Sequence, residues 1–186
     1  MTEQPLWQPA PEQIASTNVT RFAREASLRC GRNLEEYADL HRWSVEAPEE
    51  FWLNIWDWTG VIGIGDTEPV VVDREQMPGA RWFPNTRLNF AQNLLRRRDA
   101  ALALIFQAED KVTRFLSFAE LYAQVARLAD GLKKAGVVPG DRVCGFMPNM
   151  PETVAAMLAS ASVGAVWSSC SPDFGVQGVL DRFGQI

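Results

Sequence analysis

In the first half of the chain, hydrophobic residues recur at the spacing of amphipathic helices, after an N-terminal stretch that lacks this periodicity. Residues 1–15 contain three prolines and are expected to form an extended arm. Either Thr17 or Asn18 can cap the helix that follows, and Gly31 is placed to end it. The expected hydrophobic face of this helix consists of Val19, Phe22, Ala23 and Ala26.

Capping residues predict three further helices. Asn33, with Glu36 three residues later, forms the pattern of a capping pair for a short helix. Pro48, followed by two glutamates, places proline in a first helical turn and acids at the positive end of the helix dipole, and Gly60 is placed to end that helix. Another helix is expected from about Asn89. The side chains expected to face inward are Phe51, Trp52, Ile55 and Trp56 on the Pro48 helix, and Phe90, Leu94 and Leu95 on the Asn89 helix.

From about residue 101 the pattern changes to short apolar runs separated by turns. Apolar runs at 101–106 and 112–115 flank a charged turn at 109–111 and predict a β-hairpin. Ser117 and Glu120 form the sequence pattern of a capping box at the start of an amphipathic helix. The hydrophobic stripe of that helix comprises Phe118, Leu121, Tyr122, Val125, Leu128, Ala129 and Leu132.

The last part of the chain has the pattern of a strand–helix–strand unit. Residues 142–146 and 165–168 are short strand-like runs, and a helix begins between them at Pro151, with Asn149 as its expected cap. That helix has scarcely a polar face, which predicts burial on most sides. Six of the seven tryptophans precede residue 83. The predicted fold class is therefore α/β, with a small Trp-rich helical N-terminal domain followed by the first parallel βαβ units of a second domain.

Composition limits the classes of function. The chain is 47% hydrophobic and 22% charged, as in soluble globular proteins. Its net charge of −5 argues against a nucleic-acid partner, which requires a basic face. Three widely spaced cysteines and a single histidine, His41, indicate neither a disulfide framework nor a zinc site. No secretory leader pattern or membrane-spanning apolar run is present, so a cytoplasmic protein without a membrane partner is expected.

Three conspicuous motifs have structural explanations. Residues 60–65 read G-x-x-G-x-G, the reverse of the dinucleotide-binding order, and predict only a glycine-punctuated connection. The arginines at 96–98 lie where the Asn89 helix should end, which favours capping of its last carbonyls over phosphate binding. The aromatic residues Trp52, Trp56, Trp58, Trp82 and Phe83 form a small core more readily than a ligand cage.

Two groups of motifs resemble known enzymes. Trp82-Phe-Pro, followed by Arg87-Leu-Asn-Phe, resembles the N-terminal domain of the acetyl-CoA synthetase group, and this likeness covers about residues 37–95. The segments 138–143 and 148–152, in that order after the capping-box helix, resemble the opening of the adenylate-forming domain of acid–CoA ligases. The resemblance implies an N-terminal arm and helix at 1–36, an acetyl-CoA synthetase-type domain at 37–96, and the beginning of an AMP-binding domain at 97–186.

The loop after the last strand distinguishes branches of this superfamily. Acetyl- and propionyl-CoA relatives carry His-Ser and then Phe-Gly-Gly-Phe here, and their Phe-Gly-Gly segment lies beside bound CoA. In this sequence Ser171, Pro172 and Asp173 replace Phe-Gly-Gly, and Phe174 matches the final phenylalanine. This pattern resembles the acetoacetyl-CoA synthetase branch and implies that these four residues form a wall of a CoA or acyl pocket. For Asp173, capping of the next helix is an equally good explanation.

By resemblance, the whole enzyme would use ATP, Mg²⁺ and CoA to convert acetoacetate into acetoacetyl-CoA through an acyl-adenylate. No Ser/Thr/Gly-rich phosphate loop occurs in these 186 residues, so the chain alone is expected to be inactive, with no assigned catalytic or metal-binding residue. The alternatives are part of an acetyl- or propionyl-CoA synthetase, or a non-catalytic interaction module that uses the Trp-rich region. The oligomeric state stays open.

Overall fold

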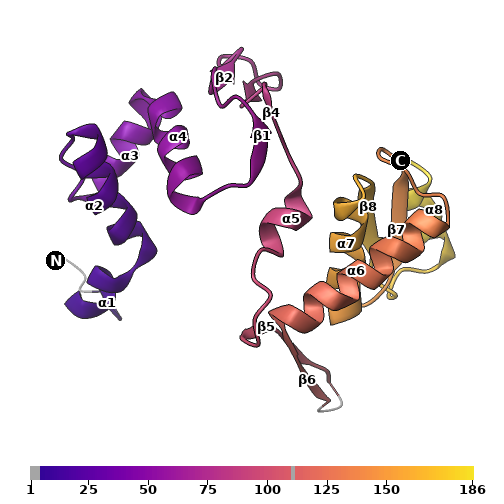
Figure 1. Ribbon diagram of the computed structural model, residues 1–186. Coiled ribbons are helices and arrows are strands. Elements are labelled where there is room, and N and C mark those ends of the chain that lie inside the picture. The colour runs from indigo at the N-terminus through magenta and orange to yellow at the C-terminus, as the bar shows by residue number, and fades with distance from the viewer. Residues whose placement is uncertain (1–4, 110–111) are drawn as a thin grey trace. The chain divides into compact units, whose positions relative to one another are not determined.

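The computed structural model describes residues 5–109 and 112–186, and it divides into two compact units, Met1–Arg87 and Leu88–Ile186 (Figure 1). Each unit is described by itself. The first four residues of the predicted arm and residues 110–111 of the predicted hairpin turn lie outside the described residues.

Four helices begin the first unit: α1 Pro11–Ser16, α2 Asn18–Cys30, α3 Tyr37–Glu46 and α4 Pro48–Thr59. The expectation of an extended arm up to residue 15 was wrong, because Pro11 occupies the first turn of α1 and Gln13 accepts a hydrogen bond from the Ala10 amide at 2.8 Å. The prediction for α2 is confirmed: Thr17 caps it by accepting from the Thr20 amide, and Gly31 ends it at φ 66°.

The core of the first unit lies where α2, α3 and α4 meet. Phe22 stacks on Trp43 at 6.3 Å between ring centroids, and Phe51 meets Trp43 edge-on at 5.2 Å. Trp43 is 2% exposed, whereas Trp52 is 43% exposed, so the expectation that Trp52 would be buried was wrong. Besides Phe22 and Trp43, the buried residues of this core are Ala23, Ala26, Leu34 and Leu40.

Two further expectations about this unit need correction. Asn33 and Glu36 do not form a capping pair: Asn33 accepts from the Glu35 amide at 3.3 Å, and Glu36 itself is the N-cap residue of α3, without a side-chain cap. Val19 lies on α2 but is 49% exposed. The prediction that Gly60 ends α4 is confirmed by its left-handed φ of 63°.

Short strands complete the first unit. They are β1 Gly63–Gly65, β2 Val71–Val72, β3 Arg81–Trp82 and β4 Thr86–Leu88, paired as β1 with β4 and as antiparallel β2 with β3. Phe83 adopts a φ of 45°, and its ring lies 4.6 Å from that of Trp56. Trp52 meets Trp82 edge-on at 5.9 Å. The predicted aromatic cluster thus contributes packing between α4 and the strands.

In its described residues, 88–109 and 112–186, the second unit contains a hairpin, a parallel strand pair and four helices. The elements are α5 Phe90–Leu94, β5 Leu102–Gln107, β6 Thr113–Ser117, α6 Phe118–Lys134, β7 Arg142–Phe146, α7 Pro151–Ser162, β8 Val166–Cys170 and α8 Val176–Phe183. The predicted antiparallel hairpin and the capping box are both confirmed, with Ser117 accepting from the Glu120 amide. Helix α7 packs against α5, α6 and β8, and the core consists of Ala91, Leu95, Leu121, Val125, Ala155, Leu158 and Ala159.

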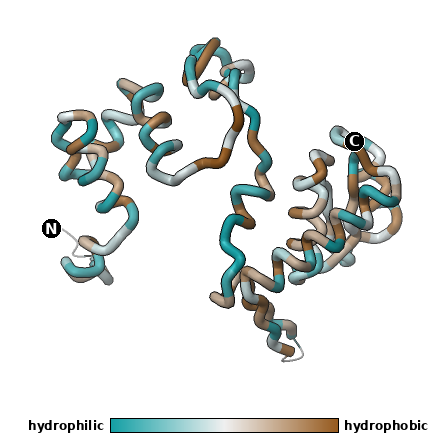
Figure 2. Tube along the Cα trace, in the orientation of Figure 1, coloured by the Kyte–Doolittle hydropathy of each residue, from teal (hydrophilic) through white to brown (hydrophobic). Residues whose placement is uncertain are grey.

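The segment around α5 departs from the sequence-based expectations in two ways. Phe90 and Leu94 are 54% and 50% exposed, while Ala91 is fully buried and Leu95 nearly so. The arginines that follow do not lie in the last turn of α5. Instead Arg97 pairs with Asp99 at 3.0 Å and covers the Phe118 ring, and the hydrophilic colour of this segment is plain in Figure 2.

Strands β7 and β8 form the predicted parallel pair, in register from Arg142 opposite Val166 to Phe146 opposite Cys170. Gly145 leaves room on this pair for the indole of Trp167, which a Cβ at that position would overlap. The backbone turns from α7 into β8 at Gly164, which has a φ of 83°.

Candidate functional site

The candidate site lies at the carboxyl ends of β7 and β8. Because the two strands are parallel and in register, the loops after Phe146 and Cys170 emerge at the same edge of the pair. The Met147 amide donates to the Cys170 carbonyl at 3.2 Å, which ties the two loops together at their starts. In open α/β sheets this edge is where ligands bind.

The residues predicted for the pocket wall form a tight turn in the second loop. The Ser171 hydroxyl donates to the Asp173 carboxylate at 2.6 Å, and the Phe174 amide donates to the Ser171 carbonyl at 3.2 Å. Pro172, Asp173 and Phe174 are all exposed. The turn therefore presents the Pro172 ring, the Asp173 carboxylate and part of the Phe174 side chain to solvent.

The capping explanation for Asp173 is wrong. The N-cap residue of α8 is Gly175, and no side chain caps this helix. Asp173 uses one carboxylate oxygen to accept from Ser171, within the loop itself. The structural role of Asp173 is therefore within the tight turn, through its hydrogen bond with Ser171, and not at the start of α8.

Phe174 lies against α8. The Cζ atom of Arg182 is 3.6 Å from the centroid of the Phe174 ring, and the Arg182 guanidinium also donates to the Gly178 carbonyl at 3.2 Å. A Cβ at Gly178 would lie 3.3 Å from the Phe174 side chain. The ring is therefore held between a glycine and an arginine of the helix that follows it.

The first loop leads into α7 and borders a cavity of about 280 Å³. Its lining comprises Leu104, Ile105, Phe106, Gln107, Asn149, Met150, Pro151 and Val154. Asn149 does not cap α7 as expected, because the N-cap residue is Met150, without a side-chain bond. Beside the cavity, Arg114 donates to Glu152 at 2.6 Å, and this hydrogen bond lowers the pKa of the Glu152 carboxyl. Here β6 is joined to the first turn of α7.

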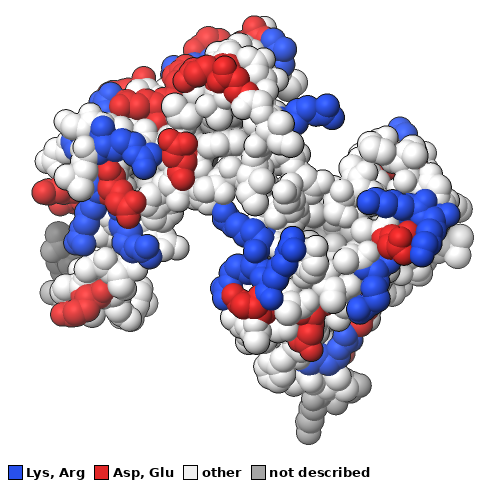
Figure 3. Space-filling model, in the orientation of Figure 1, with Lys and Arg blue, Asp and Glu red and all other residues white. Residues whose placement is uncertain are grey.

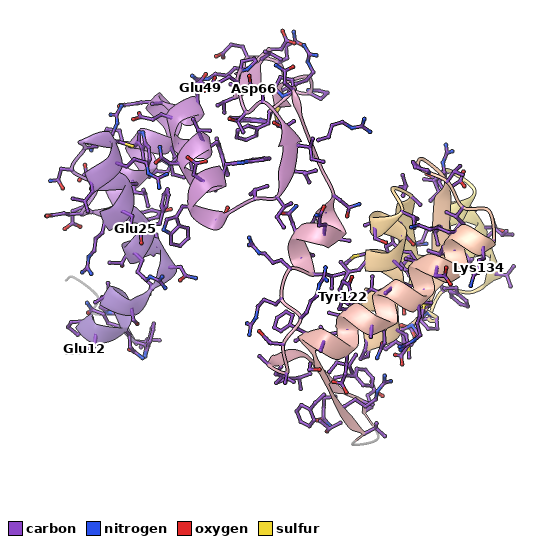
Figure 4. All side chains as sticks on the ribbon, in the orientation of Figure 1. Glu12, Glu25, Glu49, Asp66, Tyr122 and Lys134 are labelled. Carbon is purple, nitrogen blue, oxygen red and sulfur yellow. The ribbon has the colours of Figure 1, made fainter. Side chains whose placement is uncertain are left out.

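A second cavity, of about 300 Å³, lies between α5 and α6. Arg98 lines it, with its guanidinium 4.0 Å from the centroid of the Tyr122 ring; Tyr122 is labelled on α6 in Figure 4. Basic side chains gather in this part of the unit in Figure 3. The cation–π contacts of Arg97 and Arg98 fix the segment after α5 to the start of α6.

Neither a metal cluster nor a membrane span occurs in the part of the chain that the structure describes. Among residues 5–109 and 112–186, no three His, Cys, Asp or Glu side chains come together as metal ligands. No helix in these ranges is long and apolar enough to cross a membrane.

Two family models match the chain. One, described as AMP-binding enzyme, matches residues 90–183, and the other, described as Acetyl-coenzyme A synthetase N-terminus, matches residues 37–94. The first covers the parallel strand pair and the candidate loop, and the second covers α3, α4 and the short strands.

Individual relatives match over nearly the whole chain. The acetoacetyl-coenzyme A synthetase of Rhizobium meliloti (strain 1021) is 51% identical over 184 residues, and the malonamoyl-CoA synthetase of Penicillium aethiopicum is 36% identical over 191 residues. Each alignment covers 99% of this chain, but only 28% and 26% of the respective relative. The solved acetoacetyl-CoA synthetase from Streptomyces lividans matches with a TM-score of 0.91 and 46% identity, over 99% of this chain and 29% of that one. The chain thus spans little more than a quarter of these proteins.

Proposed function

The chain belongs to the AMP-binding enzyme family, and from this we propose that it is part of an ATP-dependent ligase that joins acetoacetate to CoA. The observation that carries the proposal is the similarity to acetoacetyl-CoA synthetases over 99% of the chain, in sequence and in structure. In this reaction the acid carboxylate attacks the α-phosphorus of ATP, which releases pyrophosphate and forms an acyl-adenylate. The CoA thiolate then attacks the acyl carbon and releases AMP.

We assign the 171–174 loop to the wall of the CoA or acyl pocket. It lies at the ligand-binding edge of the strand pair, and Asp173 is exposed and does not cap α8. The carboxylate of Asp173 can accept a hydrogen bond from an amide or hydroxyl of the ligand, while Ser171 holds its other oxygen. The Phe174 ring offers an apolar surface beside it.

The names of two relatives suggest a class of acyl substrate. Acetoacetate and malonamate are both short acids with a carbonyl group on the β-carbon, and they differ only in a methyl against an amino group. We propose that this ligase accepts β-carbonyl acids of this size. Acetate and propionate lack the second carbonyl group, so they would make fewer hydrogen bonds in such a pocket.

Mg²⁺ usually keeps several waters and is held by one or two carboxylates together with substrate phosphates, so no Mg²⁺ ligand is assigned among the described residues. No cluster of three His, Cys, Asp or Glu side chains exists in the part of the chain that is described. Hard cations of this kind need oxygen ligands in near-octahedral geometry. We therefore assign no step through Mg²⁺ to this chain, whose part in the proposed reaction is to shape one wall of the pocket.

A cytoplasmic location also belongs to the proposal. Cys30, Cys144 and Cys170 are free thiols, as suits a reducing compartment.

A chimera tests the function. Residues 1–186 replace the matching segment of the Streptomyces lividans enzyme, and ATP- and CoA-dependent thioester formation is measured with acetoacetate, malonamate, acetate and propionate. We expect activity with the first two acids. The intact Streptomyces lividans enzyme is the positive control. A folded chimera that forms no thioester would favour the non-catalytic interaction module instead.

A loop exchange inside the chimera tests the assignment of the pocket wall. The triple variant Ser171→Phe, Pro172→Gly and Asp173→Gly introduces the sequence typical of acetyl- and propionyl-CoA relatives. We expect kcat/KM for acetoacetate or CoA to fall, with the melting temperature little changed. Unchanged kinetic constants for both substrates would show that the loop is not part of the pocket wall.

A further inference from the structure

Phe174, Gly178 and Arg182 lie four residues apart along one side of α8 and its entry. The Arg182 side chain runs back over one helical turn, where it donates to the Gly178 carbonyl at 3.2 Å and places Cζ 3.6 Å from the Phe174 ring centroid. A guanidinium at this distance over a ring face is in cation–π contact. Phe174 is 38% exposed, so most of its surface is covered even though it lies in a surface loop.

Gly178 makes this packing possible. A Cβ at this position would lie 3.3 Å from both Cβ and Cδ1 of Phe174, and 3.6 Å from the nearer guanidinium nitrogen of Arg182. Glycine destabilises a helix interior because it loses the most backbone entropy on folding. Gly178 is in the first turn of α8, and the absence of a side chain there is explained by the ring that lies against it.

The same contacts fix the far end of the candidate loop. At its near end, the Cys170 carbonyl is held by the Met147 amide at 3.2 Å. Between the two ends, the turn relies on the Ser171 hydroxyl and on the amide of Phe174 itself. The position of Asp173 thus depends on where the Phe174 ring is held.

Arg182 has a second, more ordinary explanation, because it lies in the last turn of α8, where a cation stabilises the negative end of the helix dipole. A dipole effect requires only the charge. A lysine ammonium can make a cation–π contact or donate to a carbonyl, but it cannot lie flat on the Phe174 ring and donate to the Gly178 carbonyl at once, as the planar, forked guanidinium does. The two explanations can therefore be separated by substitution.

We propose that Arg182 is a positioning residue that clamps Phe174 against Gly178 and thereby holds Asp173 and the 171–174 loop in place to bind ligand. This inference rests on the proposed function, since it specifies how the same pocket wall is fixed. The clamp acts on ligand affinity and takes no part in the transfer of the acyl group.

The test compares Arg182→Met, which keeps a long apolar side chain, with Arg182→Lys, which keeps the charge at the helix end. Both are made in the chimera, with Arg127→Met, at an exposed arginine of α6, as the matched control. Loss of the clamp should raise KM for CoA or for acetoacetate about two- to fivefold, the equivalent of one exposed cation–π contact. We expect kcat to be unchanged, Arg182→Lys to recover only part of the loss, and the control to behave as wild type.

Hydrogen exchange supplies a readout that does not depend on activity. The Phe174 amide, which donates to Ser171, should exchange faster in Arg182→Met and in Gly178→Ala than in the control. Full recovery by Arg182→Lys, or unchanged KM and exchange in Arg182→Met, would overturn the clamp. If the unmodified chimera is inactive, the proposed function fails, and the exchange rates still decide whether the clamp exists.

Discussion

The first prediction concerns Trp43 and Trp52, because the structure buries Trp43 and exposes Trp52, which was expected to be buried. Trp43 is 2% exposed, packs against Phe22 and Phe51, and donates from Nε1 to Glu50 at 2.9 Å. Trp52 is 43% exposed and meets Phe51 and Trp82 edge-on. Truncation of a buried indole removes its packing and leaves a cavity, so Trp43→Ala should lower the free energy of unfolding of the first unit by about 3–5 kcal/mol.

Trp52→Ala is the matched control, because it deletes the same side chain from a position that water already reaches. Its loss should be well under half of that for Trp43→Ala, since less surface is returned to solvent and little cavity forms. The assay is urea denaturation of both variants followed by far-UV circular dichroism, with the midpoint and slope fitted separately. Equal losses, or a larger loss at Trp52, would refute the assignment of Trp43 to the core.

Three further predictions follow from other contacts. The hydrogen bond from Trp43, helped by Arg32, lowers the pKa of the Glu50 carboxyl. The ionised carboxylate therefore stabilises the fold above the usual glutamate pKa, and this contribution is lost as pH falls through the folded-state pKa. The free energy of unfolding, measured as pH is lowered, should fall less steeply in Glu50→Gln than in the unmodified chain. Gly145→Ala should disrupt the β7–β8 pairing because the new methyl overlaps the indole of Trp167, and a lowered melting temperature checks this. Asp173→Ala in the chimera should raise KM for CoA or acetoacetate while the melting temperature stays constant; the reverse result would mean a structural role.

Several helix starts and ends were predictable because their signals are local, although the caps expected at Asn33 and Asn149 were not found. Thr17, Ser117 and Gly31 act on backbone groups within a few residues, and the structure confirms all three. Local signals also carried the resemblance to adenylate-forming ligases, which the family matches confirm. The missed helix α1 had its own local signal in Pro11 and Gln13, which the density of prolines obscured.

The buried face of a helix was harder to predict than its ends. Of the three residues expected to face inward at α5, Leu95 is buried as predicted, but its buried partner is Ala91, whereas the pair Phe90 and Leu94 is exposed. Both pairs have helical spacing, and only the position of α7 decides between them. Large hydrophobic residues such as Phe90 are readily predicted to be buried, yet here the small Ala91 is the residue that lies in the core.

The position of the candidate loop at a strand end was predictable from the sequence, but the side-chain contacts within it were not. The sequence located the loop at a strand end, because the apolar run stops there. Whether Asp173 caps α8 depends on where that helix begins, and the start at Val176, with Gly175 as the N-cap residue, excludes it. The clamp on Phe174 was not predicted, although the regular spacing of four residues between Phe174, Gly178 and Arg182 was a signal for it.

Trp167 has a consequence for spectroscopy. Of the seven tryptophans, it is the one that follows residue 82, so it is the sole indole fluorophore of the second unit. Its ring lies over Gly145, and Trp167 itself is three residues before Cys170, the last residue of β8 before the 171–174 loop. With the six earlier tryptophans replaced by phenylalanine, the emission of the chain would come from this one ring. Ligand arrival at the strand ends could then be followed optically in real time, without an added label.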